Sequence, residues 1–231
     1  TTAGIQRFID TKELGIQRQP DIYYYDYATR LMTWERANAP MFILIYTTLN
    51  HFPWYARFRE DLTPTWPTLG QNLDGRSLEL DEYVRRQSIS ADDFPKLINQ
   101  LKSQFPGEPF LIVRFGDHQP SFVRNLVDPY ATEEEVSQRI QSYDPRYLTT
   151  YYAIDTVNFT PVDLSSWLDT LDAAYLPLAV LEAAGVPLDP TFAEQKKILQ
   201  RCRGMFYLCN NGAEARRLNR LLIDAGYIKG F

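Results

Sequence analysis

The sequence lacks the features by which several classes of protein are recognised. Its formal net charge is −5, so nothing in the bulk charge points to nucleic acid or to an anionic membrane surface as a partner. No apolar run approaches the roughly 18 residues of a membrane span. Cysteine is scarce, because Cys202 and Cys209 are the only two. They are expected to form either one local disulfide or two free thiols.

The remaining composition is that of a folded protein. The chain has 231 residues, of which 45% are hydrophobic and 14% aromatic, so it can bury a sizeable core. We expect a single domain over residues 1–231. The first residues, 1–4, do not resemble a natural start, which predicts a processed product or an excised domain.

One apolar run ends at a glycine and is followed by an acid and a histidine. Phe110–Phe115 predicts a buried strand. Gly116 would then let the backbone turn sharply, so that Asp117 and His118 face one point. Carboxylate oxygen and imidazole nitrogen are both ligands for zinc or manganese. The alternative is a surface turn in which Asp117 caps backbone amides and His118 lies in solvent.

The only other histidine also follows an apolar run. Met41–Thr48 predicts a second buried strand, and His51 comes shortly after it. Two parallel strands in one sheet would deliver both imidazoles to the same edge, where open α/β sheets bind their ligands. The alternative for His51 is a ring that packs against Trp54 or caps a turn.

The connection between these two runs predicts the class of fold. A strand, a long connection that contains a helix, and another strand form the pattern of a parallel crossover. A third strand is expected over 147–154. We therefore predict an α/β fold with a mainly parallel sheet flanked by helices. The loop-rich stretch 57–80 is either a rim or lid over a site or an ordinary surface loop.

Helix signals are clear at several places. Ser90 and Asp93 form a Ser-x-x-Asp capping pattern at the start of an apolar stripe. Because Pro95 is tolerated only in the first turn of a helix, Asp92 is the alternative N-cap. Thr132 and Glu135 form a capping box. The full set of expected helices is 22–37 with Asp21 as N-cap, about 81–87, 90–105, one following Thr132, 172–184, 193–203 and 213–225.

Taken together, the stretches Asn50–Trp54 and Phe115–His118 resemble the sulfatase-like branch of the alkaline phosphatase superfamily. The likeness is greatest to lipoteichoic acid synthase and the phosphoglycerol transferases of bacterial envelopes, and it spans about residues 20–190. The resemblance implies an alkaline-phosphatase-like sheet that lacks its N-terminal part.

In that family a Thr or Ser nucleophile attacks phosphorus or sulfur beside a divalent metal. Carried over by position, the resemblance makes Asp117 and His118 metal ligands, for Mn, Zn, Mg or Ca. It makes His51 the histidine that contacts the substrate. A metal would lower the pKa of the nucleophile and neutralise charge on the transferred group. His51 would donate a hydrogen bond to a phosphoryl oxygen or protonate the departing alkoxide.

The sequence departs from the family in one large respect. The nucleophile and the early acidic ligand belong to a segment that would precede residue 1, and no motif upstream of His51 replaces them. Thr47 and Thr48 are expected to be core threonines of their strand. The chain thus resembles the C-terminal half of a catalytic domain. Its partner would be the missing N-terminal segment, and by itself it is expected to turn over nothing.

The function implied for the intact protein is a transfer or hydrolysis of phosphoryl-alcohol groups, of phosphoglycerol or phosphoethanolamine type. Its substrates would be small phosphate or sulfate esters, including lipid-linked ones, of the cell envelope. The implied location is periplasmic or extracytoplasmic, as part of a membrane-anchored parent. One alternative is a sulfate-ester hydrolase on the same scaffold. Another is a non-catalytic α/β module that binds a partner through the loop 55–80.

Overall fold

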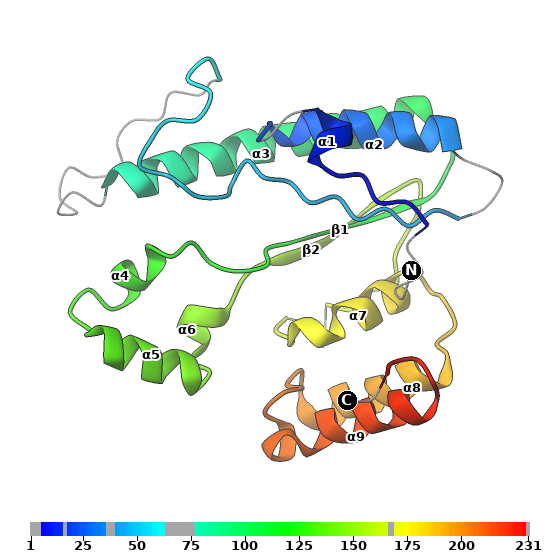
Figure 1. Ribbon diagram of the computed structural model, residues 1–231. Coiled ribbons are helices and arrows are strands. Elements are labelled where there is room, and N and C mark those ends of the chain that lie inside the picture. The colour runs from blue at the N-terminus through cyan, green and yellow to red at the C-terminus, as the bar shows by residue number, and fades with distance from the viewer. Residues whose placement is uncertain (1–5, 16–17, 36–39, 63–76, 166–168, 230–231) are drawn as a thin grey trace. The chain divides into compact units, whose positions relative to one another are not determined.

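The structure is a computed structural model that describes residues 6–15, 18–35, 40–62, 77–165 and 169–229 (Figure 1). The chain divides into two compact units. Unit 1 comprises Thr1–Gly107 and His118–Thr149, and unit 2 comprises Glu108–Asp117 and Thr150–Phe231. The single domain expected over 1–231 stays a prediction. In the described ranges, no helix combines the length and the apolarity needed to cross a membrane.

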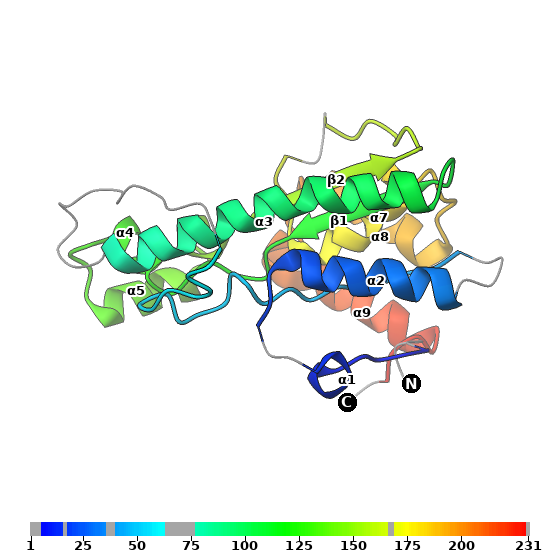
Figure 2. The same cartoon turned by 90° about the horizontal axis from the view of Figure 1, so that it is seen from above.

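Unit 1 is built on two long helices that run side by side (Figure 2). Helix α2 contributes Tyr24, Ala28 and Leu31 to the core, and α3 contributes Leu97 and Leu101. Apolar side chains at helical spacing thus give each helix one buried stripe. The helices of this unit are α1 (Thr11–Leu14), α2 (Asp21–Glu35), α3 (Ser77–Gln104), α4 (Val123–Val127), α5 (Glu133–Gln141) and α6 (Pro145–Leu148).

Helix α3 corrects the expectation of two separate helices over 81–87 and 90–105. It is continuous from Ser77 to Gln104, and Pro95 lies in its interior, not in a first turn. A proline at such a position removes one helical hydrogen bond. The helix continues through it because side chains on both sides, from Ile89 to Leu101, are anchored in the core.

Both polar residues of the Ser-x-x-Asp pattern form hydrogen bonds outside their own helix. Asp93 Oδ2 accepts a hydrogen bond from the backbone N–H of Ile22 at 3.0 Å, so this carboxylate caps the start of α2. Ser90 Oγ accepts one from Asn50 Nδ2 at 2.9 Å. Asp21, expected as the N-cap, is the first residue of α2 and is buried. By contrast, the capping box of Thr132 and Glu135 is confirmed at the start of α5.

Unit 2 combines a two-stranded sheet with helices. Strand β1 (Phe110–Phe115) pairs with β2 (Tyr152–Val157) in antiparallel register, with Phe110 opposite Val157. The helical elements are η1 (Ala173–Tyr175), α7 (Leu176–Ala183), α8 (Pro190–Cys202), η2 (Cys209–Gly212) and α9 (Ala213–Asp224), close to the helices expected from 172 onwards.

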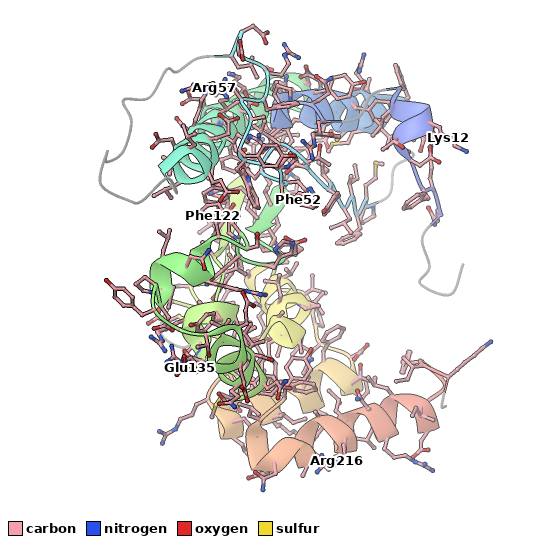
Figure 3. All side chains as sticks on the ribbon, turned by 60° about the vertical axis from the view of Figure 1, so that its left-hand side comes forward. Lys12, Phe52, Arg57, Phe122, Glu135 and Arg216 are labelled. Carbon is pink, nitrogen blue, oxygen red and sulfur yellow. A yellow bond between two sulfur atoms is a disulfide. The ribbon has the colours of Figure 1, made fainter. Side chains whose placement is uncertain are left out.

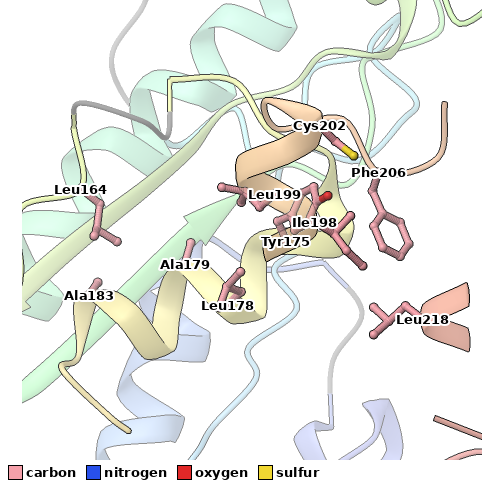
Figure 4. Packing of buried hydrophobic residues seen from close by; sticks show 10 residues of the cluster. All are labelled: Leu164, Tyr175, Leu178, Ala179, Ala183, Ile198, Leu199, Cys202, Phe206 and Leu218. Carbon is pink, nitrogen blue, oxygen red and sulfur yellow. The ribbon is translucent and has the colours of Figure 1, made fainter. Parts of the chain in front are cut away.

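The core of unit 2 lies among these helices and the loops beside them (Figure 4). Leu111 of β1 and Ile154 of β2 pack against it. Cys202 and Cys209 form a disulfide with a Cα–Cα distance of 5.7 Å, which decides between the two expectations for these residues. The buried members of the core are Leu164, Tyr175, Leu178, Ala179, Ala183, Ile198, Leu199, Cys202, Phe206 and Leu218.

The mainly parallel sheet is not found in the part of the chain that the structure describes. The strand over 110–115 is confirmed, but its predicted burial is wrong, because its residues are half-buried and Phe115 is exposed. Its partner begins at Tyr152, since α6 occupies Pro145–Leu148, and the pair is antiparallel. An apolar run does not specify the direction of the strand beside it. What the structure shows is a mixture of helices with a small antiparallel sheet.

Met41–Thr48, expected as a buried strand, belongs to no sheet among the described residues. It runs as an extended chain whose side chains alternate between half-buried and exposed (Figure 1). Phe42, Leu44 and Tyr46 are exposed, so the predicted burial is wrong on this face. Of the loop expected over 57–80, residues 63–76 lie outside the described ranges.

Gly116 generates a prediction about the end of β1. The chain bends at Asp117 and His118, directly after it, and its φ is not positive, so the bend does not require the left-handed conformation that favours glycine. A Cβ at this position would lie 2.3 Å from Thr150 Oγ1. We expect Gly116→Ala to lower the free energy of unfolding by about 1–2 kcal/mol, because the neighbour must shift. Urea denaturation measures this loss.

The control is the same substitution in a Thr150→Ala background, where the clashing oxygen is gone. The loss should then be much smaller than in the wild-type background. Equal losses in both backgrounds would contradict a steric origin.

Candidate functional site

A buried arginine of α3 forms hydrogen bonds with the loop that carries His51. Arg86 is 1% exposed. Its Nη1 donates to the carbonyl of His51 at 2.8 Å, and its Nη2 donates to the carbonyl of Pro53 at 2.8 Å. The carbonyls of Leu49 and Ala56 accept further hydrogen bonds from the same side chain. The backbone on both sides of His51 is thereby fixed to α3.

Arg85 holds the next part of the loop in the same way. Its guanidinium donates to the carbonyls of Phe58, Arg59 and Leu62. Glu82, one turn earlier, accepts from Arg86 Nε at 2.8 Å and from the backbone N–H of Phe58 at 2.9 Å. We call Glu82, Arg85 and Arg86 the arginine clamp. The clamp thus gives the irregular backbone of this loop hydrogen-bond partners on α3.

An aromatic cluster joins the His51 loop to the stretch that follows His118. Trp54, Tyr83 and Phe122 pack edge to face, with ring centroids 5.3 Å apart for Trp54 and Phe122 and 5.7 Å for Tyr83 and Phe122. Trp54 follows His51 closely and Phe122 follows His118 closely. Figure 3 labels Phe122 and Phe52, the residue next to His51. Both histidine-bearing segments of unit 1 therefore share one apolar anchor.

The two imidazoles are oriented alike. His51 Nδ1 lies 3.1 Å from the carbonyl oxygen of Phe52, and His118 Nδ1 lies 2.9 Å from the carbonyl oxygen of Gln119. A carbonyl only accepts, so each Nδ1 carries the proton and each neutral ring has its lone pair at Nε2. A backbone carbonyl on one ring nitrogen is the usual way in which proteins orient a histidine that uses the other. The ring of His51 also packs against Phe52, at 4.5 Å between centroids, and not against Trp54.

Asp117 and His118 are consecutive and exposed, just beyond β1. The N–H of Gly116 still donates to the carbonyl of Tyr151 at 3.1 Å, so the strand pairing extends to the residue before them. The boundary between the two units falls between Asp117 and His118. Within the described ranges, no group of three or more His, Cys, Asp or Glu side chains comes together as a metal site. The structure thus offers a pair of donors and not a complete set.

Asp21, which the sequence predicts only as a helix cap, is a buried carboxyl group close to the segment that precedes His51. Asp21 is 4% exposed, and its Oδ1 has no hydrogen-bond partner among the described residues. Burial raises the pKa of Asp21 and the charge of Asp93 raises it further, while the hydroxyls of Ser90 and Thr47 lower it. Thr47 therefore faces a polar cluster, although we expected a core threonine.

One surface hollow of about 310 Å³ lies on the α2–α3 pair, lined by Tyr23, Asp26, Thr29, Arg30 and Gln104. It includes neither histidine, so it is not the expected site.

Comparisons with family models, curated proteins and solved structures found no match for this chain. The roles of His51, Asp117 and His118 thus stay predictions.

The arginine clamp gives a prediction about stability. Arg86→Gln would leave several carbonyls of the loop without their donor and would remove one of the donors to the Glu82 carboxylate. Removing one partner of a buried charged network costs about 3–5 kcal/mol, and we expect a loss of that size in the free energy of unfolding by guanidinium denaturation. Arg57→Gln, an exposed change in the same loop, should change stability by less than about 0.5 kcal/mol. Similar losses in the two variants would refute the clamp.

Asp21 gives a prediction about pH. Its carboxyl group titrates near 3.9 in the unfolded chain, and burial raises its pKa in the folded one. The folded state then binds the proton more tightly, so stability falls as the pH rises from the unfolded pKa through the folded pKa. Asn mimics the neutral carboxyl group. Asp21→Asn should therefore raise the melting temperature at pH 7 and change it little at pH 4.

Asp61 provides the contrasting variant for the pH measurement. Its hydrogen bond with Arg59 lowers the pKa of Asp61, so the sign is opposite and Asp61→Asn should not stabilise the protein at pH 7. A melting temperature of Asp21→Asn that follows that of the wild type at every pH would contradict the burial effect.

Proposed function

We propose that this chain is the C-terminal part of a metal-dependent sulfatase-like enzyme that transfers or hydrolyses phosphoryl-alcohol groups, of phosphoglycerol or phosphoethanolamine type. In this proposal the intact sheet is alkaline-phosphatase-like and mainly parallel. His51 contacts the substrate, and Asp117 and His118 bind the metal. The observation that carries the proposal is the packing of Trp54 on Phe122, which anchors the two histidine-bearing segments together.

The donor chemistry at Asp117 and His118 is compatible with a divalent cation. A carboxylate oxygen and a neutral imidazole with its lone pair at Nε2 are common ligands of Mn and Zn. They supply two ligands, and structural and catalytic zinc sites use three or four from the protein. When bound, the metal would lower the pKa of a nucleophile and neutralise charge on the transferred group.

His51 has the geometry of a proton donor in its charged form. Because Nδ1 is bound to the carbonyl of Phe52, only the imidazolium carries a proton on Nε2. That proton is available to a phosphoryl oxygen or to a departing alkoxide. The arginine clamp holds the peptide of His51 in place, so that the ring is presented by a rigid loop.

The nucleophile and the first acidic ligand would come from a polypeptide segment outside residues 1–231. The chain offers a place for such a segment to pair. Within the described ranges, the backbone of 41–47 makes no hydrogen bond, and Phe42 is 89% exposed. An added strand would satisfy that backbone and bury Leu44 and Tyr46 beside it. This accounts for an extended segment whose residues Phe42, Leu44 and Tyr46 are exposed in the described structure.

The proposed location is periplasmic or extracytoplasmic. The disulfide between Cys202 and Cys209 supports it, because such bonds form and persist in oxidising compartments. The substrates proposed are small phosphate or sulfate esters, including lipid-linked ones.

Manganese binding tests the proposal, because the chain has only two histidines and their imidazole NMR signals are easily assigned. Paramagnetic Mn²⁺ should broaden the signals of both His118 and His51 in the 231-residue chain. Asp117→Asn should weaken this effect at least about tenfold, since it removes a ligand oxygen. Asp163→Asn, an exposed change elsewhere, should leave it unchanged.

The other outcomes are equally informative. Broadening of His118 with a sharp signal from His51 would show that the two residues do not share a site. No selective broadening of either histidine would remove the metal from the proposal and favour a non-catalytic binding module.

A further inference from the structure

The side chains of Arg18 and His51 bind the same carbonyl oxygen, that of Phe52. The guanidinium of Arg18 donates from Nη2 to the carbonyl oxygen of Phe52. The same oxygen accepts from His51 Nδ1 at 3.1 Å. Two side chains that are distant in the sequence thus converge on one atom, which places a cation next to the imidazole. Nothing in the sequence around Arg18 indicated a role at this loop.

No carboxylate in the part of the chain that the structure describes pairs with Arg18. Among the described residues, its hydrogen bond to Phe52 is its only polar contact, although a guanidinium has five N–H donors. Arg59 makes the contrast clear, because its Nε and Nη2 bind the carboxylate of Asp61 at 2.8 and 2.7 Å. Arg18 is half-buried, so water screens its charge less than it would on an open surface.

The charge of Arg18 also acts on the arginine clamp. Burial is the main cause that lowers the pKa of Arg86, and the positive charge of Arg18 lowers it further. Glu82 opposes these effects, because its hydrogen bond and its charge raise the same pKa. The three cations Arg18, Arg85 and Arg86 nevertheless face this one carboxylate near the loop. An anion placed there would be attracted.

We propose that Arg18 and His51 form a binding subsite for the tetrahedral oxyanion of the substrate, a phosphoryl or sulfuryl group. This inference rests on the proposed function, in which His51 contacts that group. The planar guanidinium presents donors in a fork that matches two oxygens of such an anion, and hydrogen bonds between charged groups are the strong ones. The charged imidazole adds a donor at Nε2. Together they supply recognition that does not depend on a metal.

The backbone at Arg18 is consistent with a fixed position. Its φ is +56°, in the left-handed region that few residues other than glycine adopt. Such conformations persist where the surroundings hold them, and they gather at ligand sites. Arg59 shares this feature, with a φ of +50°. It therefore provides a matched control whose guanidinium is already paired.

The experiment is a titration of the 231-residue chain with inorganic phosphate, and separately with sulfate, in the presence of EDTA. The imidazole NMR signal of His51 is followed, assigned with the variant His118→Gln. We expect both anions to shift it. Arg18→Gln should weaken the apparent affinity about tenfold, and Arg18→Lys should weaken it less because the charge is kept. Arg59→Gln should leave the affinity unchanged.

Two results would overturn the inference. If Arg18→Gln binds phosphate as tightly as the wild type, Arg18 is not part of the subsite, and the manganese test of Asp117 and His118 is unaffected. If neither anion shifts the His51 signal, the contact proposed between His51 and the substrate fails as well. Circular dichroism of each variant shows whether it is folded.

Discussion

The burial of two guanidinium groups under one loop is the interaction on which unit 1 depends. A buried arginine needs acceptors for all its N–H groups, and an irregular loop packed on a helix needs donors for its carbonyls. Arg86 meets both needs in full and Arg85 meets them through its two Nη atoms, with Glu82 between them, while Nε of Arg85 has no partner among the described residues. Neither the loop nor the helix face would be stable without the other. The path of the chain around His51 is therefore held by α3 as well as by a local turn, in which the N–H of His51 donates to the carbonyl of Thr48.

The aromatic cluster extends this constraint to the second histidine. Tyr83 lies on the same helix as the clamp, and it packs against Trp54 from the loop and Phe122 from the stretch after His118. Edge-to-face aromatic contacts have defined geometry, so they limit how far the two segments can move apart. Both histidines then use a neighbouring carbonyl to fix their tautomer. Anchoring and orientation thus come from separate, local interactions.

Sequence reasoning succeeded where the signal is local. The capping box at Thr132 and the strand 110–115 are both in the structure. It failed where a side chain acts on another element. Asp93 matches a capping pattern but caps α2 instead, and nothing in a run of polar helix residues distinguishes a buried Arg86 from a solvated one. The direction of strand pairing is not specified locally either, because an apolar run does not identify its partner.

Counting the N–H donors already in use shows which arginines near the His51 loop serve the fold and which has donors left for a ligand. Arg86 uses Nε on Glu82, and each of its Nη atoms on two carbonyls. Its five N–H groups are thus engaged, and a ligand could recruit it only by breaking the loop. Arg59 is held by Asp61. Arg18 has one carbonyl partner and remaining donors. If an anion binds beside His51, Arg18 is the guanidinium among these three that can meet it without dismantling the fold.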